Sequence, residues 1–91
     1  MARFEYNSEK SKTNKERHGI DFDEARELWE GPHVIIPAKN VLGENRYAIL
    51  GLVRKRVHMA IYTERGAGIR IISCHKADKR WVNLYEKSIK G

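Results

Sequence analysis

The sequence has little of what stabilises exported proteins or holds proteins in membranes. Its one cysteine, Cys74, cannot close a disulfide within the chain or supply a cysteine-rich zinc site. The longest uncharged apolar run, residues 47–53, is far shorter than the roughly 20 residues that a membrane-spanning helix needs. The chain also lacks the charged-then-apolar opening of a signal peptide. We therefore expect a cytoplasmic protein with no membrane partner, stabilised by its packed core alone.

The chain is also too short to contain two hydrophobic cores. It has 91 residues, and chains rarely divide into two domains below roughly 150 residues. Hydrophobic residues make up 41% and charged residues 33% of the sequence, a composition too apolar for disorder and too polar for a membrane protein. We predict a single domain over residues 1–91.

Acidic residues are scarce in the second half of the chain. Residues 54–91 carry ten basic residues against three acidic ones, whereas residues 1–53 carry eight against nine. The whole excess of positive charge, +6 at pH 7, therefore lies in the second half. Such a field attracts polyanions, of which nucleic acid is the commonest in the cytoplasm. A basic face that is merely solvated explains the composition equally well.

The order of polar and apolar residues predicts an α+β fold: an antiparallel β-sheet with two N-terminal helices and a C-terminal helix. Alternating or β-branched segments bounded by turn residues predict strands at residues 3–6, 33–36, 46–53, 57–63 and 69–74. Capping residues and helical spacing predict helices at residues 9–18, at residues 21–30 and from residue 76 onward. The first of these helices has no apolar stripe, so it cannot dock by hydrophobic burial in the usual way.

Several short motifs occur in a fixed order along the chain. The first half contains residues 4–7 (Phe-Glu-Tyr-Asn), Lys10, Asn14 and residues 17–20 (Arg-His-Gly-Ile), with Phe22 and Ala25. The second half contains Glu44, Arg46, residues 62–66 and above all residues 70–73 (Arg-Ile-Ile-Ser), followed by Lys76, Ala77 and Tyr85. This ordered set, which covers nearly the whole chain, resembles the BrnT-type toxins of bacterial toxin–antitoxin pairs. Those toxins usually have Trp-Asp where Tyr6 and Asn7 stand here.

The resemblance implies a RelE-like fold and a small ribonuclease that cuts messenger RNA and halts translation. It also implies a cognate, BrnA-like antitoxin that neutralises the toxin. The chain would then be linked to DNA only indirectly, through this antitoxin. Two residues depart from the family pattern: His75 stands where the family commonly has Arg, and Trp81 where it commonly has Glu. These departures indicate either a subgroup with a different acid–base arrangement or a chain whose nuclease activity is weak.

The residue types present favour chemistry without a metal. The four histidines lack paired ligand spacing, and residues 66–68 (Gly-Ala-Gly) lie in a predicted hairpin rather than between a strand and a helix. We therefore expect neither a metal nor a nucleotide cofactor. RNA can be cut without them because its own 2′-OH attacks the adjacent phosphate, so that a base, an acid and cations suffice.

Four residues are candidates for this catalysis. His75 closes a predicted strand, and an imidazole both accepts and donates protons near neutral pH; the alternative is an ordinary surface histidine. Arg70 lies within an apolar strand, so it either binds a carboxylate such as Glu64 or contacts a phosphate. Arg65, at a hairpin mouth, is a second phosphate ligand or a solvated turn residue. Glu64 either acts as the base or orients an arginine.

Five further residues are predicted to bind RNA. Long-range attraction is assigned to the hairpin residues Arg54, Lys55 and Arg56, and a weaker phosphate contact to Lys76. Tyr85 stacks on a base unless it belongs to the core, as tyrosines on apolar helix faces usually do. His18 is interpreted as a helix-end residue that complements the helix dipole.

A function of another class fits the same sequence. The chain could bind RNA or a partner without cutting it, and act as a corepressor with an antitoxin that binds DNA. A small reading frame immediately downstream that encodes such an antitoxin would distinguish a toxin from an isolated binding module.

Overall fold

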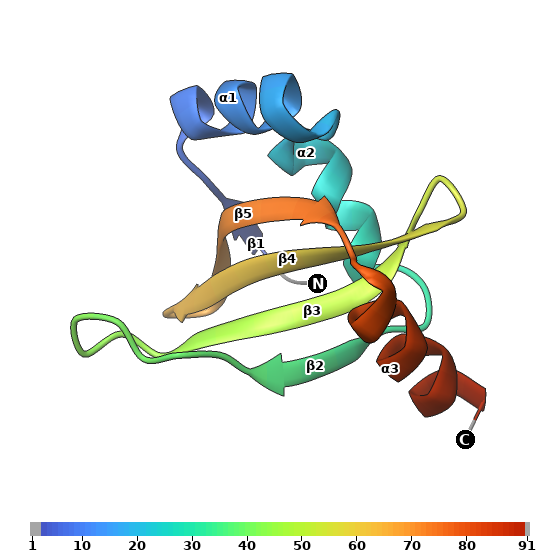
Figure 1. Ribbon diagram of the computed structural model, residues 1–91. Coiled ribbons are helices and arrows are strands. Elements are labelled where there is room, and N and C mark those ends of the chain that lie inside the picture. Colours follow the sequence, from blue (N-terminus) through green and yellow to red (C-terminus); the bar gives the residue numbers. More distant parts are fainter. Residues whose placement is uncertain (1–2, 91) are drawn as a thin grey trace.

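The fold joins one five-stranded sheet to helices at both ends of the chain (Figure 1). The computed structural model describes residues 3–90. The elements are β1 (Arg3–Glu5), α1 (Ser8–His18), α2 (Phe22–Ala25), the 3-10 helix η1 (Arg26–Trp29), β2 (Val34–Pro37), β3 (Arg46–Val53), β4 (Arg56–Arg65), β5 (Gly68–Lys76) and α3 (Lys79–Lys90). The strands are ordered β1-β5-β4-β3-β2. The predicted α+β class is confirmed.

The prediction of a wholly antiparallel sheet is wrong at one edge. β1 pairs with β5 in parallel, from Arg3 opposite Gly68 to Glu5 opposite Arg70, whereas the pairs from β2 to β5 are antiparallel. A parallel pair needs a long connection between its strands, which here contains every element from α1 to β4. The alternation of residues 3–6 identifies a strand but carries no information on its direction.

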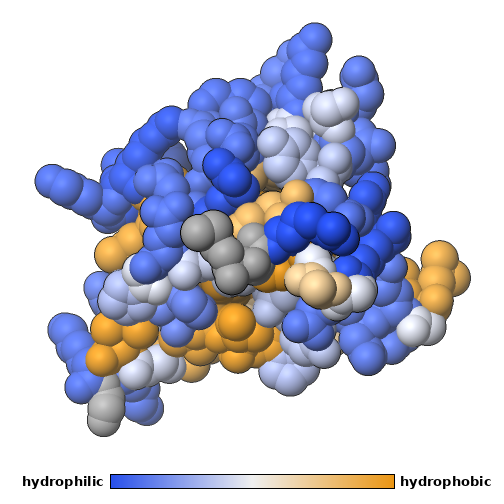
Figure 2. Space-filling view, turned by 180° about the vertical axis from the view of Figure 1, so that it is seen from behind, coloured by the Kyte–Doolittle hydropathy of each residue, from blue (hydrophilic) through white to orange (hydrophobic). Residues whose placement is uncertain are grey.

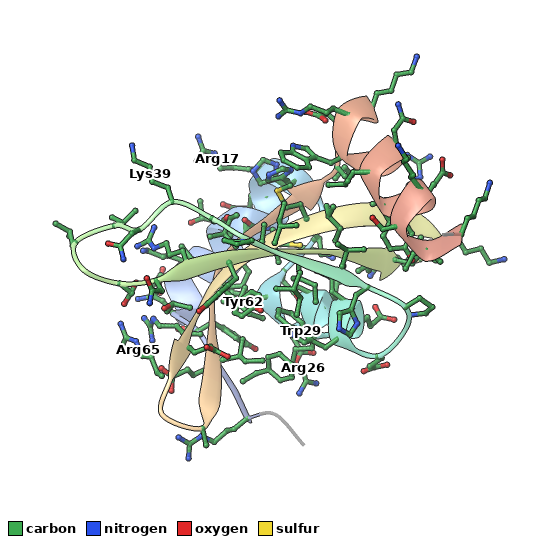
Figure 3. All side chains as sticks on the ribbon, turned by 90° about the horizontal axis from the view of Figure 1, so that it is seen from below. Arg17, Arg26, Trp29, Lys39, Tyr62 and Arg65 are labelled. Carbon is green, nitrogen blue, oxygen red and sulfur yellow. The ribbon has the colours of Figure 1, made fainter. Side chains whose placement is uncertain are left out.

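Both faces of the sheet are covered, each by helices from one end of the chain. On one face α2 and η1 bury the apolar side of the strands, including Ile49, Tyr62 and Cys74. On the other face α3 places Tyr85 against a second cluster that includes Leu50. Figure 3 shows this separation, with Trp29 and Tyr62 on one side of the sheet and α3 on the other.

Helix α1 lies along the β5 edge of the sheet and docks by hydrogen bonds rather than by apolar burial (Figure 1). Its surroundings at the top of the molecule are almost wholly hydrophilic in Figure 2. Its buried residues are Ser11 and Asn14, and the Ser11 hydroxyl accepts a hydrogen bond from the Phe22 N–H at 2.9 Å. A few buried polar side chains therefore dock this polar helix. Its sequence pattern does not predict this docking, because the helix has no apolar stripe.

Asn14 completes the edge of β5 where no strand lies beside it. β1 pairs with β5 only up to Arg70. Farther along, the Asn14 amide donates to the Cys74 carbonyl at 2.6 Å and accepts from the Cys74 N–H at 3.3 Å. It also donates to the Ile20 carbonyl at 2.8 Å. One side chain thus satisfies three buried backbone groups, which would be costly to leave unpaired.

The ends of the predicted helices differ from the structure in two places. The capping box of Asp21 and Glu24 forms as expected, but the α-helix ends at Ala25 and continues as η1. This tighter turn lies directly on β3, where a Cβ added to Gly51 would meet the Leu28 carbonyl at 3.0 Å. The 3-10 geometry of η1 is therefore set by its packing against Gly51. The helical pattern of the sequence does not predict this packing.

Helix α3 begins three residues later than predicted. β5 continues to Lys76, and the Asp78 carboxylate then accepts a hydrogen bond from the Trp81 N–H at 3.2 Å at the start of the helix. Arg80 lies over the Trp81 ring, 4.5 Å from its centroid. Among residues 3–90, no helix is both long and apolar enough to cross a membrane.

Replacing Asn14 with alanine is expected to lower the free energy of unfolding by about 2–4 kcal/mol, because buried backbone groups of Cys74 and Ile20 lose their partners. Urea unfolding followed by circular dichroism measures the change. Lys12→Ala, at an exposed position of the same helix, is the control and is expected to change stability by less than about 0.5 kcal/mol. Equal stability of the two variants would contradict the role given to Asn14.

Candidate functional site

A cleft lies between α1 and the unpaired part of β5, and we refer to it as the α1–β5 cleft. Its volume is about 380 Å³, and its lining is Glu9, Lys10, Thr13, Asn14, Arg17, His18, Phe22, Ile72 and Ser73. The α1 residues recur at helical spacing, so they form one face of the helix. Three of them, Lys10, Arg17 and His18, bring basic groups to the cleft, against one carboxylate from Glu9. The cleft is therefore suited to an anion.

A β-bulge in β5 shapes the opposite wall of the cleft. Ile61 and Tyr62 of β4 are adjacent, yet they pair with Ser73 and Ile71, so Ile72 is left without a partner. Neighbouring residues of a regular strand point to opposite faces, but a bulge turns the strand locally. Ile72 and Ser73 consequently both border the cleft.

Two histidines lie close together beside the cleft: His18 is part of its lining, and His75 lies next to His18, outside that lining. His18 is in the last turn of α1, and His75 is near the end of β5. Their ring centroids are 5.8 Å apart, with the ring planes inclined at 48°. Both rings are thus close enough to contact one phosphate group.

The hydrogen bond of His75 determines which of its ring nitrogens is free. Its Nδ1 lies 2.9 Å from the Lys76 carbonyl oxygen. Because a carbonyl only accepts, Nδ1 carries the hydrogen in this bond. In the neutral ring Nε2 then keeps its lone pair, which can accept a proton from a substrate.

The other catalytic candidates lie at the opposite end of β5. Arg70 is five residues before His75, roughly 15 Å away at the usual rise of a strand, and it is paired with Glu5 at 3.5 Å. Arg65, near the β4–β5 hairpin, lies 3.6 Å from Glu44, and Figure 3 shows it well away from Arg17. The structure therefore does not bring Arg70 and Arg65 together with His75.

Arg46 joins this second group of charges. Its Nε is buried and lies 3.5 Å from Glu44 Oε1, an ion pair without hydrogen-bond geometry. This Nε has no hydrogen-bond partner within residues 3–90. Glu64 belongs to the neighbouring surface, where it lines a cavity with Glu44 and Tyr47. Burial is the main cause of the raised pKa of Tyr62, and the negative charge of Glu64 raises that pKa further. Glu64 is not paired with Arg70, which was one of its two predicted roles.

The residues predicted to bind RNA are divided by the structure. Arg54, Lys55 and Arg56 form the β3–β4 hairpin, where Arg54 is bound to Glu24. Lys76 lies at the end of β5, opposite His58 of β4. Tyr85 is only 5% exposed, and its hydroxyl donates to the Pro32 carbonyl at 3.1 Å. Its ring belongs to the core and is not accessible to an RNA base in this conformation, contrary to the predicted stacking.

The sequence matches a known protein family over most of its length. Residues 6–80 match the model of the family described as "Ribonuclease toxin, BrnT, of type II toxin-antitoxin system". The chain belongs to the BrnT toxin family. The resemblance noted in the sequence is confirmed.

A solved BrnT structure has the same fold. The ribonuclease toxin BrnT of Brucella abortus is similar with a TM-score of 0.71 and 21% sequence identity, over 87% of this chain and 100% of that chain. The curated proteins contain no match. The α+β architecture of this BrnT family member is thus that of a known BrnT toxin.

The BrnT motifs from the two halves of the chain meet at the α1–β5 cleft. Lys10, Asn14, Arg17 and His18 come from the first set of motifs, and Ser73 comes from the second. His18, Arg17 and Lys10, which line the cleft, are not among the site residues predicted from the sequence, because nothing local links a polar helix to a strand more than fifty residues away. The signal that could have found them is the joint presence of basic residues in both sets of motifs.

The neighbouring Cys74 plays no chemical part in this BrnT cleft. Its side chain is fully buried, as expected for a small hydrophobic residue. Burial raises the pKa of its thiol to about 12, so the thiol stays protonated and unreactive at neutral pH.

Proposed function

We propose that this chain is a metal-independent endoribonuclease that cuts RNA in the α1–β5 cleft and thereby inhibits translation. Membership of a family of ribonuclease toxins gives the reaction class. The observation that supports this location is the pair of imidazoles, His18 and His75, 5.8 Å apart beside a cleft lined by basic residues. These are the groups that cleavage by the RNA 2′-OH requires.

In this proposal His75 is the base. Its Nδ1–H is held by the Lys76 carbonyl, so Nε2 takes the proton of the 2′-OH as that oxygen attacks the adjacent phosphorus. The bond from phosphorus to the 5′-oxygen of the next nucleotide breaks, and His18 donates a proton to that oxygen. His18 lies in the last turn of α1 and lines the cleft.

Lys10 and Arg17 stabilise the charge that grows on the phosphate oxygens during attack. Both line the cleft beside His18, and neither has a carboxylate within salt-bridge distance among residues 3–90. Their positive charge is therefore available to a ligand. Arg70 and Arg65, whose charges are shared with Glu5 and Glu44, have a supporting role in this scheme rather than a direct one.

A neutralising antitoxin must cover this basic cleft, so we propose that it presents acidic residues to α1 and β5. The His75 and Trp81 departures from the family pattern are compatible with activity in this arrangement. His75 supplies a proton carrier where the family has a permanent cation, and Trp81, a residue of α3, packs against the core cluster beneath that helix.

Induced expression in a bacterial host tests the function as a whole. The chain is expected to arrest growth and to fragment cellular RNA, and co-expression of the protein encoded immediately downstream is expected to restore growth and to copurify. The double variant His18→Ala/His75→Ala, produced at the same level, is expected to allow normal growth. Arrest by the double variant would favour the non-catalytic, partner-binding alternative.

A further inference from the structure

A second cavity adjoins the α1–β5 cleft at the end of α1. Its volume is about 260 Å³, and its polar lining consists of His18, Arg54, Arg56, His58 and Lys76. The remaining lining residues are uncharged, and none of the carboxylates of residues 3–90 borders the cavity. Because His18 also borders the α1–β5 cleft, the two cavities follow one another along the surface. We call the second one the hairpin pocket, since the β3–β4 hairpin forms one wall.

Two cations of the hairpin pocket are available to a ligand. Arg54 is bound to Glu24, which also holds Lys15 at 2.7 Å. Arg56 and Lys76, in contrast, have no carboxylate within 4.0 Å among residues 3–90. They come from neighbouring strands, β4 and β5. A single anion between them can therefore be held from two sides.

The turn of the β3–β4 hairpin holds two basic residues in a costly backbone conformation. Arg54 and Lys55 have φ values of 52° and 68°, in the left-handed region where a two-residue hairpin favours Asn-Gly. The chain instead carries three consecutive basic residues here. Basic residues thus stand at this turn where turn geometry alone favours other residues.

His58 forms the floor of the hairpin pocket and is only 6% exposed. Its Nδ1 donates to the Arg56 carbonyl at 2.9 Å, which leaves Nε2 for another contact. Burial lowers the pKa of His58, and the positive charges of Lys76, His75 and Arg56 lower it further, while the hydrogen bond to the Arg56 carbonyl partly opposes this lowering. The other charged or titratable groups at the pocket are His18 of α1 and Arg54, the latter bound to Glu24 of α2. An anion would offset these positive charges, so its binding should be accompanied by proton uptake at His58.

We propose that the hairpin pocket binds a phosphate group of the RNA chain next to the phosphate that is cut. This inference rests on the proposed function, because it assigns the scissile phosphate to the α1–β5 cleft. The pocket has the volume of several water molecules, each about 30 Å³. It combines Arg56 and Lys76, which have no carboxylate within 4.0 Å among residues 3–90, with the imidazole of His58. The phosphate is either an internal phosphodiester or the terminal phosphate of a chain end.

Binding of short oligonucleotides tests the proposal independently of cleavage. DNA oligonucleotides lack the 2′-OH and stay intact, so their affinities are measured directly by fluorescence anisotropy with a labelled end. A trinucleotide, with two phosphodiesters, is expected to bind about 10-fold more tightly than a dinucleotide, with one. A dinucleotide with an added 5′- or 3′-phosphate distinguishes the sources: affinity equal to that of the trinucleotide identifies a chain end as a sufficient ligand.

Charge-neutralising variants connect this affinity to the pocket. Arg56→Gln and Lys76→Gln are each expected to remove most of the advantage of the trinucleotide and to reduce the slope of log affinity against log salt by about 0.7. Lys87→Gln removes the same charge from an exposed position on α3 and is expected to change neither. Equal affinity of wild type for dinucleotide and trinucleotide would overturn the proposal, even if the protein still cleaves RNA.

Inorganic phosphate provides a second, direct probe. In NMR titrations of the histidine side chains, phosphate is expected to move the His58 titration to higher pH in the wild type and not in Lys76→Gln. A His58 titration that is the same with and without phosphate would exclude the pocket as a phosphate site. If the wild type does not cleave RNA but phosphate still moves its His58 titration to higher pH, the result would count against the proposed function alone.

Discussion

Replacement of His75 with alanine is expected to slow RNA cleavage by about 10²–10⁴-fold, the usual contribution of a positioned acid or base. Its Nδ1 is held by the Lys76 carbonyl, and its Nε2 makes no hydrogen bond to another residue in the described part of the chain. The wild-type rate should fall at low pH, where the base is protonated, and at high pH, where the acid has lost its proton. His75→Ala should lose the fall at low pH, and His18→Ala should lose the fall at high pH.

A matched control separates this role from a general loss of charge. His33 is exposed, lies immediately before β2 and hydrogen bonds to the Gly31 carbonyl, so His33→Ala is expected to keep both limbs of the pH profile. The double variant His18→Ala/His75→Ala should be only slightly slower than either single variant, because the two groups act in one step. A His75→Ala enzyme with wild-type rates across the profile would transfer the role of base to another group, and Glu64 would be the next candidate.

Truncation of Arg17 is expected to cost about 2.7–4 kcal/mol of transition-state stabilisation, or about 10²–10³ in kcat. Arg17 lines the α1–β5 cleft, and its positive charge is most valuable when negative charge grows on the phosphate oxygens. KM should change much less than kcat, since the interaction is stronger in the transition state than in the bound substrate. Single-turnover cleavage of a short RNA measures both.

Arg65→Ala is the informative comparison for Arg17→Ala. Both residues are exposed arginines, so the two variants lose the same charge and the same kind of side chain. Arg65 lies near Glu44 at the far end of the sheet, and its truncation is expected to reduce kcat less than about 10-fold, as expected for a charge that acts at long range. If Arg65→Ala loses as much activity as Arg17→Ala, the site lies at the β4–β5 hairpin.

The sequence predicts most of the elements because their signals are local. Asp21 and Glu24 form the expected capping box, and Gly19 ends α1 in the left-handed region with a φ of 75°. The hairpin-length connections after β3 and β4 produce the expected antiparallel pairs. The direction of the edge strand β1 has no such local signal, because it depends on β5, a partner more than sixty residues away in the sequence.

The candidate site was harder to predict than the fold for the same physical reason. The chemistry of an imidazole predicts a role for His75, but the sequence predicts only a helix-end role for its neighbour His18, since nothing in the order of residues shows that α1 lies beside β5. That contact depends on Asn14, a polar residue in a polar helix. The bulge at Ile72, which directs Ser73 into the cleft, likewise has no signal in the alternation of β5.

The ends of the RNA products test the central claim most directly. If the 2′-OH attacks the phosphate between His75 and His18, the upstream product must end in a 2′,3′-cyclic phosphate, and cleavage must continue in excess EDTA. The purified protein is incubated with an end-labelled RNA, with and without EDTA, and the product ends are identified by mass spectrometry. An RNA with a single 2′-deoxy nucleotide at the cut site should resist cleavage there. Products with a 3′-hydroxyl, or activity that disappears with EDTA, would contradict the account.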